Sequence, residues 1–428
     1  MDAVKKVYDD HRKAVLFSSA AALRVLLFLW FPSLPNSLTA RVELSTATNS
    51  YKRLQEGLFL YERGVDPYDG GVFHQAPLLL PLFSLLPSPS TWVGTVASIL
   101  LYTGLDIICA NCLYQIAESG AAYKSRLFTT PRIGRTWRPL TVAAIYLFNP
   151  LTLLTCLGRP TTVFTTLFTL LSITNACQAR MFNAVFALAV ASYISLHPVL
   201  LLAPIALLCY DQICAHNGFV FSLNLVTTFM TVIALLLGLS RLLLPSWRFI
   251  PSVYLTTMAL PDLTPNPGLW WYFFIEMFDA FREFFLGVFW LHMLSYSVPF
   301  CLRFQKQPLA AVILMMGVVA VFQPYANVGD AGTWLSCLAL LSHIFELSSI
   351  HRYTFPAIAA LLYSILLGPA FHHLWIYAGS GNANFFYAIT LVWSLALLIL
   401  LTDTVYSVLR DEWESERPEG KGKEIRQI

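Results

Sequence analysis

The stretch "NAVFALAVASYISLHPVLLLAPIALLC", residues 183–209, decides how this chain is folded. It is apolar almost throughout, and a His197-Pro198 pair lies near its middle. A proline inside a helix removes a backbone hydrogen bond and clashes with the preceding turn. We therefore expect two short helical passes here instead of one long helix. The choice sets the orientation of everything that follows residue 219.

The composition indicates an integral membrane protein. Of 428 residues, 57% are hydrophobic and 12% are charged, and the mean hydropathy is +0.63. Soluble domains are about one quarter charged. Apolar runs recur along the whole length, so residues 1–428 are expected to form a single membrane-embedded domain. The net charge of +3 is small and its basic residues are scattered, which argues against nucleic acid as a partner.

Each apolar run is predicted to be a helix, because a chain that crosses lipid must satisfy its backbone polar groups internally. The runs are 14–31, 92–117, 139–157, 161–177, 183–209, 219–244, 284–302, 309–323, 332–347, 354–371 and 384–409. Division of the fifth run gives about twelve transmembrane helices. The fold class is therefore an all-α polytopic membrane protein.

The distribution of Lys and Arg predicts the orientation. Basic residues are concentrated before residue 14, in the loop 124–138 and in the tail 410–428, which are all expected on the cytosolic side. Two ends on one side require an even number of crossings, which favours division of the run 183–209 over one tilted helix. The polar segments that then share the luminal side are 32–91, 245–268, 324–331 and 372–383.

The second luminal region, residues 245–283, joins a loop to an interfacial helix. Its centre reads "PDLTPNPGLWWYFFIEMF", residues 261–278, in which three prolines exclude a regular helix before the aromatic stretch. A helix dense in aromatic residues suits the membrane interface. Its side chains are candidates for contact with acyl tails or a partner helix, and the alternative is an aromatic belt that only anchors the chain.

The first luminal segment, residues 32–91, contains "DPYDGGVFHQAPLLL" at 66–80. This layout resembles polytopic glycosyltransferases that use dolichol-phosphate sugars, in particular the mannosyltransferases of glycosylphosphatidylinositol (GPI) assembly. Such enzymes need an acidic group or pair early in this loop. Here Glu43 stands alone until Glu56, and Asp66 and Asp69 adjoin turn residues where aspartates usually cap turns. Transfer of a sugar with Glu43 as base remains the alternative function.

Other chemistry has little support in the sequence. Motifs for a nucleophile elbow, a zinc protease or a phosphate-binding loop are absent. The adjacent His372 and His373 would point roughly 100° apart on a helix, so we expect no metal site. Charged residues within the apolar runs are few, and the sequence shows no internal repeat. Both observations argue against a transporter, which is the third possible function. The main charged residues in these runs are Arg24, Asp106, Glu346 and Asp403.

Three stretches together closely resemble the U-subunit family of the GPI transamidase, named for phosphatidylinositol glycan class U. They are "DPYDGGVFHQAPLLLPLF", "PDLTPNPGLWWYFFIEMF" and "HLWIYAGSGNANFFYAITL", and "RFIPSVY" at 248–254 and "VGD" at 328–330 also fit. The resemblance runs from the first luminal loop to the last span. It covers nearly the whole chain.

The resemblance implies a multi-pass protein of the endoplasmic reticulum membrane, built on a scaffold similar to the C-type glycosyltransferases. It implies a non-catalytic subunit without a cofactor that recognises the GPI lipid and holds the transamidase together. The catalytic dyad would belong to subunit K, and the other partners would be subunits S and T and the GPI attachment subunit. The missing acidic pair of the first luminal segment agrees with a loss of transferase chemistry.

The turn within residues 372–384 suits a glycolipid, which needs an apolar groove topped by neutral hydrogen-bonding groups. Asparagine amides both donate and accept, glycine permits close backbone approach, and histidine and tyrosine can bond phosphate or sugar. The alternative is that Asn382 only caps the last helix. The candidate lipid-binding residues are Asn382, Asn384, Ser380, Gly381, His372, His373 and Tyr377, with Asp262, Trp270, Trp271, Phe274 and Met277 in the second luminal region.

Overall fold

The computed structural model describes residues 2–88, 91–214, 217–421 and 423, with side chains from residue 10 onward. Two residues of the first predicted luminal segment (89–90) and six of the predicted tail (422 and 424–428) therefore lie outside the described residues. Across the described residues the regular structure is helical, and a single isolated bridge joins Lys124 to Thr129. The predicted all-α class is confirmed.

The helices fall into a long and a short set. The helices of twelve residues or more are α1 (Asp2–Trp30), α3 (Tyr51–Glu62), α5 (Trp92–Ser119), α8 (Thr162–Cys177), α9 (Met181–Ile194), α10 (Leu202–Ile213), α11 (Gly218–Leu243), α14 (Asp279–Arg303), α15 (Pro308–Phe322), α18 (Thr354–Ile376) and α19 (Ala383–Glu416). The shorter helices are α2 (Leu34–Thr39), α4 (Leu79–Ser84), α6 (Pro139–Phe148), α7 (Pro150–Gly158), α12 (Thr256–Ala259), α13 (Trp270–Glu276), α16 (Val328–Cys337) and α17 (Phe345–Ser348).

Seven helices in the described residues are long and apolar enough to cross a membrane. The pair α6–α7, bent by 55°, gives an eighth if it is one span. The bend falls at Asn149, whose side chain caps α7 by accepting from the Leu151 amide at 3.0 Å, directly before Pro150. Four shorter apolar helices accompany these spans. The chain is a multi-pass membrane protein.

The run 183–209 is broken into two helices, as its proline predicts. Helix α9 ends at Ile194, and Ser195 is extended with φ −145° and ψ 142°. A short 3₁₀ turn, His197–Leu201, carries Pro198 in its first turn, where a missing amide hydrogen costs nothing. Helix α10 then follows directly from Leu202. The prediction of two helices in this run is confirmed.

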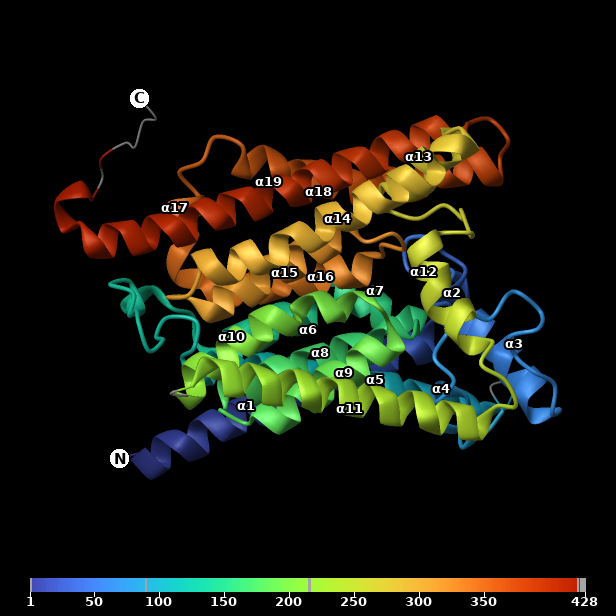
Figure 1. Ribbon diagram of the computed structural model, residues 1–428, viewed down its shortest axis with the longest axis horizontal. Helices are drawn as coiled ribbons and strands as arrows, with labels where there is room; N and C mark the ends of the chain where they lie inside the picture. Colours follow the sequence, from blue (N-terminus) through green and yellow to red (C-terminus); the bar gives the residue numbers. More distant parts are fainter. Residues whose placement is uncertain (1, 89–90, 215–216, 422, 424–428) are drawn as a thin grey trace.

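The chain runs back and forth between two ends of an elongated bundle (Figure 1). Four polar segments gather at one end, which we call the loop end: 31–88, 244–278, 323–327 and 377–382. The first turns of α1, the last turns of α19 and the loop 120–138 lie at the opposite end, which we call the terminus end. The sequence-based grouping of the polar segments is thus reproduced by the fold.

Helix α15 lies at the centre of the bundle. Its residues Pro308–Val321 are buried on every side, as expected for a helix that is apolar all round. It packs against α10, α14, α16 and α19.

Two charged groups within the spans, Arg24 on α1 and Asp106 on α5, face other helices and pair with each other. Arg24 is fully buried, and its Nε donates to Asp106 Oδ2 at 2.6 Å. Tyr146 donates its hydroxyl to the other carboxylate oxygen at 2.8 Å, and Arg24 also donates to the Leu147 carbonyl at 2.9 Å. The pair ties α1 to α5 and α6.

The predicted tail begins as helix. Residues 410–416 continue α19, and Arg410, Asp411, Glu412 and Glu414 are buried. Arg132 of the 120–138 loop donates to Asp411 at 2.5 Å and also to Glu414. The start of the predicted cytosolic tail is therefore packed onto the terminus end by charge pairs.

Candidate functional site

The α18–α19 turn, residues 377–382, is an ordered structure. The amides of Tyr377 and Ala378 donate to the His373 carbonyl at 2.9 and 3.0 Å, which closes the last turn of α18. The amides of Ser380 and Gly381 both donate to the Leu374 carbonyl. Gly379 has φ +62°, in the left-handed region that glycine enters without strain. The glycines therefore serve the turn itself.

Two asparagines stand at the start of α19, and each has a local partner. Asn382 accepts from the Phe385 amide at 3.3 Å, so it is the N-cap of α19 as the capping alternative predicts. Asn384 accepts a hydrogen bond from the Tyr272 hydroxyl on α13. Both side chains are exposed at the loop end. Capping engages only a carbonyl oxygen, which leaves the exposed amide nitrogen able to donate to a ligand.

The two adjacent histidines have different surroundings. His372 is 6% exposed and packs against the rings of Trp375, Tyr377 and Phe386. Its Nδ1 has no hydrogen-bond partner among the described residues. His373 is exposed and stacks on Tyr377 with ring centroids 5.5 Å apart. One imidazole therefore faces the protein and the other faces the surroundings. The described residues contain no cluster of metal ligands.

The aromatic helix α13 is part of the core. Trp270, Trp271 and Phe274 are 1%, 0% and 3% exposed, and Trp270 Nε1 donates to the Phe322 carbonyl at 2.7 Å. Met277 is partly exposed. This chain's own helices cover these three side chains. Contact of this stretch with acyl tails or a partner helix stays a prediction.

The aromatic side chains position the α18–α19 turn. Trp271 stacks on Trp375 of α18 with ring centroids 6.2 Å apart, and Tyr272 stacks on Tyr387 of α19 at 4.5 Å. The Tyr387 hydroxyl donates to the Leu269 carbonyl at 3.2 Å. These contacts clamp both arms of the turn against α13.

An apolar cavity of about 130 Å³ lies beside the start of α19. Its wall comes from α2, α7, α18 and α19, and includes Phe386, which follows Asn384 by two residues. The polar residues of the wall are Ser364, Thr390 and an ion pair in which Arg41 donates to both oxygens of Glu43, at 3.0 and 3.1 Å. Glu43 is therefore held by a neighbouring cation. Sequence reasoning did not identify Arg41 or this cavity.

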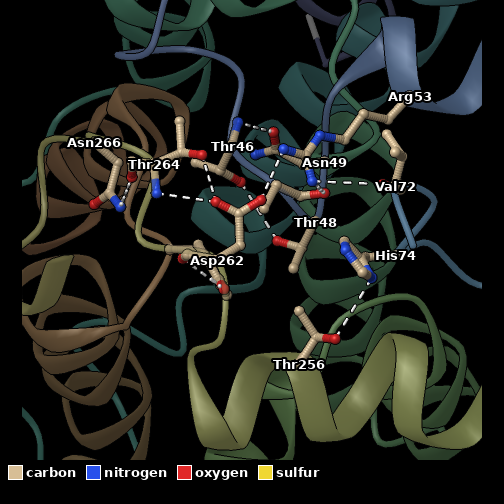
Figure 2. A network of polar contacts seen from close by, with 12 residues as sticks. Thr46, Thr48, Asn49, Arg53, Val72, His74, Thr256, Asp262, Thr264 and Asn266 are labelled. Atoms are coloured by element: carbon tan, nitrogen blue, oxygen red, sulfur yellow. Dashed lines mark hydrogen bonds and ion pairs between the residues drawn. The ribbon is translucent and has the colours of Figure 1, made fainter. Parts of the chain in front are cut away.

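Asp262 joins three loop-end segments (Figure 2). Its Oδ2 accepts from Arg53 at 2.7 Å, its Oδ1 accepts from the Thr264 amide at 2.9 Å, and its carbonyl accepts from Tyr325 at 3.0 Å. Burial raises the pKa of Asp262, but the hydrogen bonds from Thr264 and Arg53 outweigh it and hold the pKa below its ordinary value. The carboxylate is thus engaged within the protein.

His74 extends this network toward α12. Its Nδ1 lies 2.9 Å from the Ser252 carbonyl and 3.4 Å from the Thr256 hydroxyl (Figure 2). Burial lowers the pKa of His74 below its ordinary value, and the hydrogen bond to Ser252 opposes this in part. Sequence reasoning quoted His74 only as part of a motif, and nothing local pointed to its partners.

A polar cluster around the break between α9 and α10 was also missed. Two small cavities, of about 30 and 40 Å³, share Thr165, His197 and Asp330 in their walls. Asp330 accepts from Gln323 and Asn327, both at 2.6 Å. The "VGD" motif and the His197-Pro198 pair were visible in the sequence, but their proximity was not.

These observations define a class: a polytopic α-helical membrane protein whose polar loops meet at one end, where a capped, amide-bearing turn adjoins an apolar cavity. Residues 18–393 match the family model described as GPI transamidase subunit PIG-U. The chain belongs to this family. The resemblance noted from its three sequence stretches is confirmed.

Curated relatives agree over nearly the full length. The chain is 36% identical over 410 residues to the GPI transamidase component GAB1 of Saccharomyces cerevisiae, covering 94% of this chain and 96% of that protein. It is 34% identical over 408 residues to the GPI-anchor transamidase component PIGU of Homo sapiens, covering 92% and 93%. It is also 32% identical over 395 residues to the GAB1 homolog of Schizosaccharomyces pombe, covering 91% and 92%.

Proposed function

We propose that this chain is a non-catalytic subunit of the GPI transamidase of the endoplasmic reticulum membrane. In this role it recognises the GPI lipid and scaffolds the complex with subunits K, S and T and the GPI attachment subunit. Membership of the PIG-U family and the names of its relatives support a place in the complex. The observation that carries lipid recognition is the apolar cavity beside the start of α19, where Asn382 and Asn384 are exposed.

The chemistry of this region suits a glycolipid. The wall of the cavity is mostly apolar, so burial of hydrocarbon against it is favourable. The exposed amides of Asn382 and Asn384 can bond hydroxyl or phosphate oxygens of a glycan head group at the same helix start. Gly381 keeps the turn close to α18, since an added Cβ would lie 3.2 Å from the Trp375 amide nitrogen. We propose that the cavity binds the lipid tail and that the adjacent asparagine amides bind the head group.

The loop-end carboxylates favour a non-catalytic role over sugar transfer. Glu43 is held by Arg41 through two hydrogen bonds. Asp66 accepts from the Tyr68 amide at 3.0 Å and from Ser246 at 2.9 Å, and Asp69 pairs with Arg248 at 2.5 Å. A general base must be free to accept a proton from its substrate. Each of these groups already has a protein partner.

The orientation and span count belong to the same proposal. The seven spans, the bent pair α6–α7 as one span and the four shorter apolar helices would give the predicted twelve crossings if each of them crosses the membrane. The basic loop 124–138 supports a terminus end in the cytosol and a loop end in the lumen. This is the side on which a GPI head group and a protein carboxyl terminus could be joined.

A pair of asparagine variants tests lipid recognition. In cells that depend on this chain, Asn382→Ala with Asn384→Ala should lower the surface display of GPI-anchored proteins, while the other subunits still co-purify. Asn382→Ser is the matched control, because serine also caps a helix but lacks the amide. If Asn382→Ser with Asn384→Ala restores full display, the asparagines act through capping alone and the proposal fails.

The alternative function has its own test. If the chain were a dolichol-phosphate-sugar transferase, the purified protein would transfer sugar and Glu43→Gln would abolish that transfer. Our proposal expects no transfer by either protein. It also expects normal anchor attachment with Glu43→Gln, since glutamine can still accept a hydrogen bond from Arg41.

A further inference from the structure

A cavity of about 540 Å³ lies at the loop end where α1 ends and α5 begins. It lies apart from the α18–α19 turn and is lined by residues of α1, α2, α3 and α5 together with Arg159. Part of its wall is apolar, with Phe28, Leu29 and Ile99. Polar groups of Asn36 and Gln55 face the same space. An amphipathic ligand would match such a wall.

The side chain of Arg159 is buried in this wall without an anionic partner. The residue is 7% exposed, and no carboxylate pairs with it among the described side chains. Its Nη2 donates to Asn36 Oδ1 at 3.0 Å and its Nη1 to Ser98 Oγ at 3.4 Å. Its Nε has no hydrogen-bond partner. A buried cation with neutral partners only is costly to hold, so an anion would stabilise it.

The backbone holds this guanidinium in place at a further cost. Arg159 follows α7 with φ +57° and ψ +33°, a left-handed conformation that is unfavourable for residues with a Cβ. The Tyr51 ring lies 4.6 Å from the guanidinium carbon and fixes its plane. A cation held in one orientation beside a cavity suits a binding role.

The surroundings of the cavity indicate where the anion comes from. Helices α1 and α5 are both candidate membrane spans. Around the opening, Leu29, Trp30 and Trp92 are 51%, 72% and 75% exposed. Exposed tryptophans at the ends of spans mark the level of lipid head groups. The acyl chains of a phospholipid whose phosphate lies at Arg159 would thus extend along the outer surfaces of α1 and α5.

We propose that this cavity binds the phosphate of an anionic membrane phospholipid, with Arg159 as the phosphate-binding residue. The described wall carries no carboxylate that would pair with a choline or ethanolamine group, which favours a head group with net negative charge. Guanidinium groups bind phosphate through two parallel hydrogen bonds, and the unpartnered Nε supplies one donor. The lipid is a structural ligand of the loop end and separate from the GPI lipid of the proposed function.

The test uses the purified full-length chain in nanodiscs that contain phosphatidylinositol and phosphatidylcholine, with bound lipids counted by native mass spectrometry. The wild-type chain should retain phosphatidylinositol selectively. Arg159→Gln should lower that retention by at least about tenfold, the loss expected for one charge-assisted hydrogen bond. Arg63→Gln, an exposed arginine at the same end, is the matched control and should have no effect.

A second variant keeps the test decisive if Arg159→Gln does not fold. Asn36→Asp places a carboxylate where the Asn36 oxygen now accepts from Arg159, so it supplies an internal counter-ion without a change of shape. It should lose phosphatidylinositol while the chain stays folded.

Three outcomes would overturn the proposal. They are equal retention of both lipids by the wild-type chain, unchanged retention by folded Asn36→Asp, and displacement of no lipid by either variant while inorganic phosphate alone binds. The last outcome would identify a free-phosphate site. Loss of GPI-dependent activity is not the readout, so failure here leaves the proposed function standing.

Discussion

Two buried arginines contact α5, and they are satisfied in opposite ways. Arg24 on α1 is fully buried, and both its Nε and its Nη2 approach Asp106, whose other oxygen accepts from Tyr146. Arg159, at the end of α7, is 7% exposed and has only neutral partners and one aromatic ring among the described residues. Helix α5 therefore contacts both kinds of buried arginine. We call the charge of Arg24 closed because a carboxylate pairs with it, and the charge of Arg159 open because its partners are neutral.

The difference teaches how this chain uses buried charge. A buried ion pair with complete hydrogen bonding has no charge left for a ligand. Removal of either partner leaves the other uncompensated in a low-dielectric interior. A buried cation without an anion retains its attraction for one. The Arg24–Asp106 charges thus join helices, whereas the charge of Arg159 at the loop end remains available to a ligand.

The largest expected effect comes from breaking the closed pair. Arg24→Met leaves the Asp106 carboxylate buried without a cation, which should cost about 3–5 kcal/mol of stability. The measurement is the thermal unfolding of the purified chain in detergent. Arg24→Met combined with Asp106→Leu should recover most of the loss, because no charge is then stranded. A double variant as unstable as the single one would contradict this account of the pair.

A second closed cluster, at the terminus end, should give a smaller loss. Arg132 binds Asp411 and Glu414, whose side chains are 0% and 6% exposed. Arg132→Gln should lower stability by about 1–3 kcal/mol, because two carboxylates lose their shared cation. Arg135 is the matched control, since it pairs with Glu346 where both side chains are more than half exposed. Arg135→Gln should cost about 0–1 kcal/mol in the same unfolding experiment.

Acidification should loosen the Asp262–His74 network by a smaller amount. The pKa of His74 is lowered on folding, so its contribution is present above the unfolded value near 6.5 and declines as the pH falls through the folded value. The pKa of Asp262 is also lowered, and its contribution declines only below about pH 4.

Both groups are partly exposed, so we expect losses of under about 1 kcal/mol each. Thermal unfolding measured between pH 7 and pH 5 should show a shallow decrease that His74→Gln removes and Asp262→Asn leaves in place. A decrease that survives His74→Gln would assign the titration to another group.

The smallest expected effect belongs to the open arginine. In lipid-free detergent, Arg159→Gln should change the stability by no more than about 0.5 kcal/mol, because loss of the hydrogen bonds to Asn36 and Ser98 is offset by removal of a buried cation that has no anionic partner. Thermal unfolding beside Arg24→Met sharpens the comparison directly. A loss as large as that of Arg24→Met would mean that Arg159 is already paired, and the distinction between the two arginines would disappear.

Several features of the fold could be predicted from local sequence. Proline 198 ended a helix where predicted, and Asn382 capped the helix that follows it. Asp66 caps its turn by accepting a hydrogen bond from the Tyr68 amide two residues on. Each of these effects acts over a few residues, so the necessary information lies side by side in the chain.

The candidate site was predicted less completely. The exposed positions of Asn382, Asn384 and His373 agree with a role at the surface. Trp270 and Trp271 are instead core residues, because α15, α18 and α19 cover them. An aromatic residue that faces lipid and one that faces another helix are chemically alike, since both surroundings are apolar. Sequence alone could not separate them.

The amino-acid sequence by itself determined that this chain is a helical membrane protein and which of its segments meet at the loop end. Hydropathy, proline and basic residues act over a few residues. Because successive membrane helices run in opposite directions, the end at which one loop lies also determines the end at which the next loop lies. Only the tertiary structure decided which charges are closed and which are open. Arg24 finds its carboxylate 82 residues away, while Arg159 finds none among the described residues. Pairing depends on distance in space, which sequence spacing does not encode.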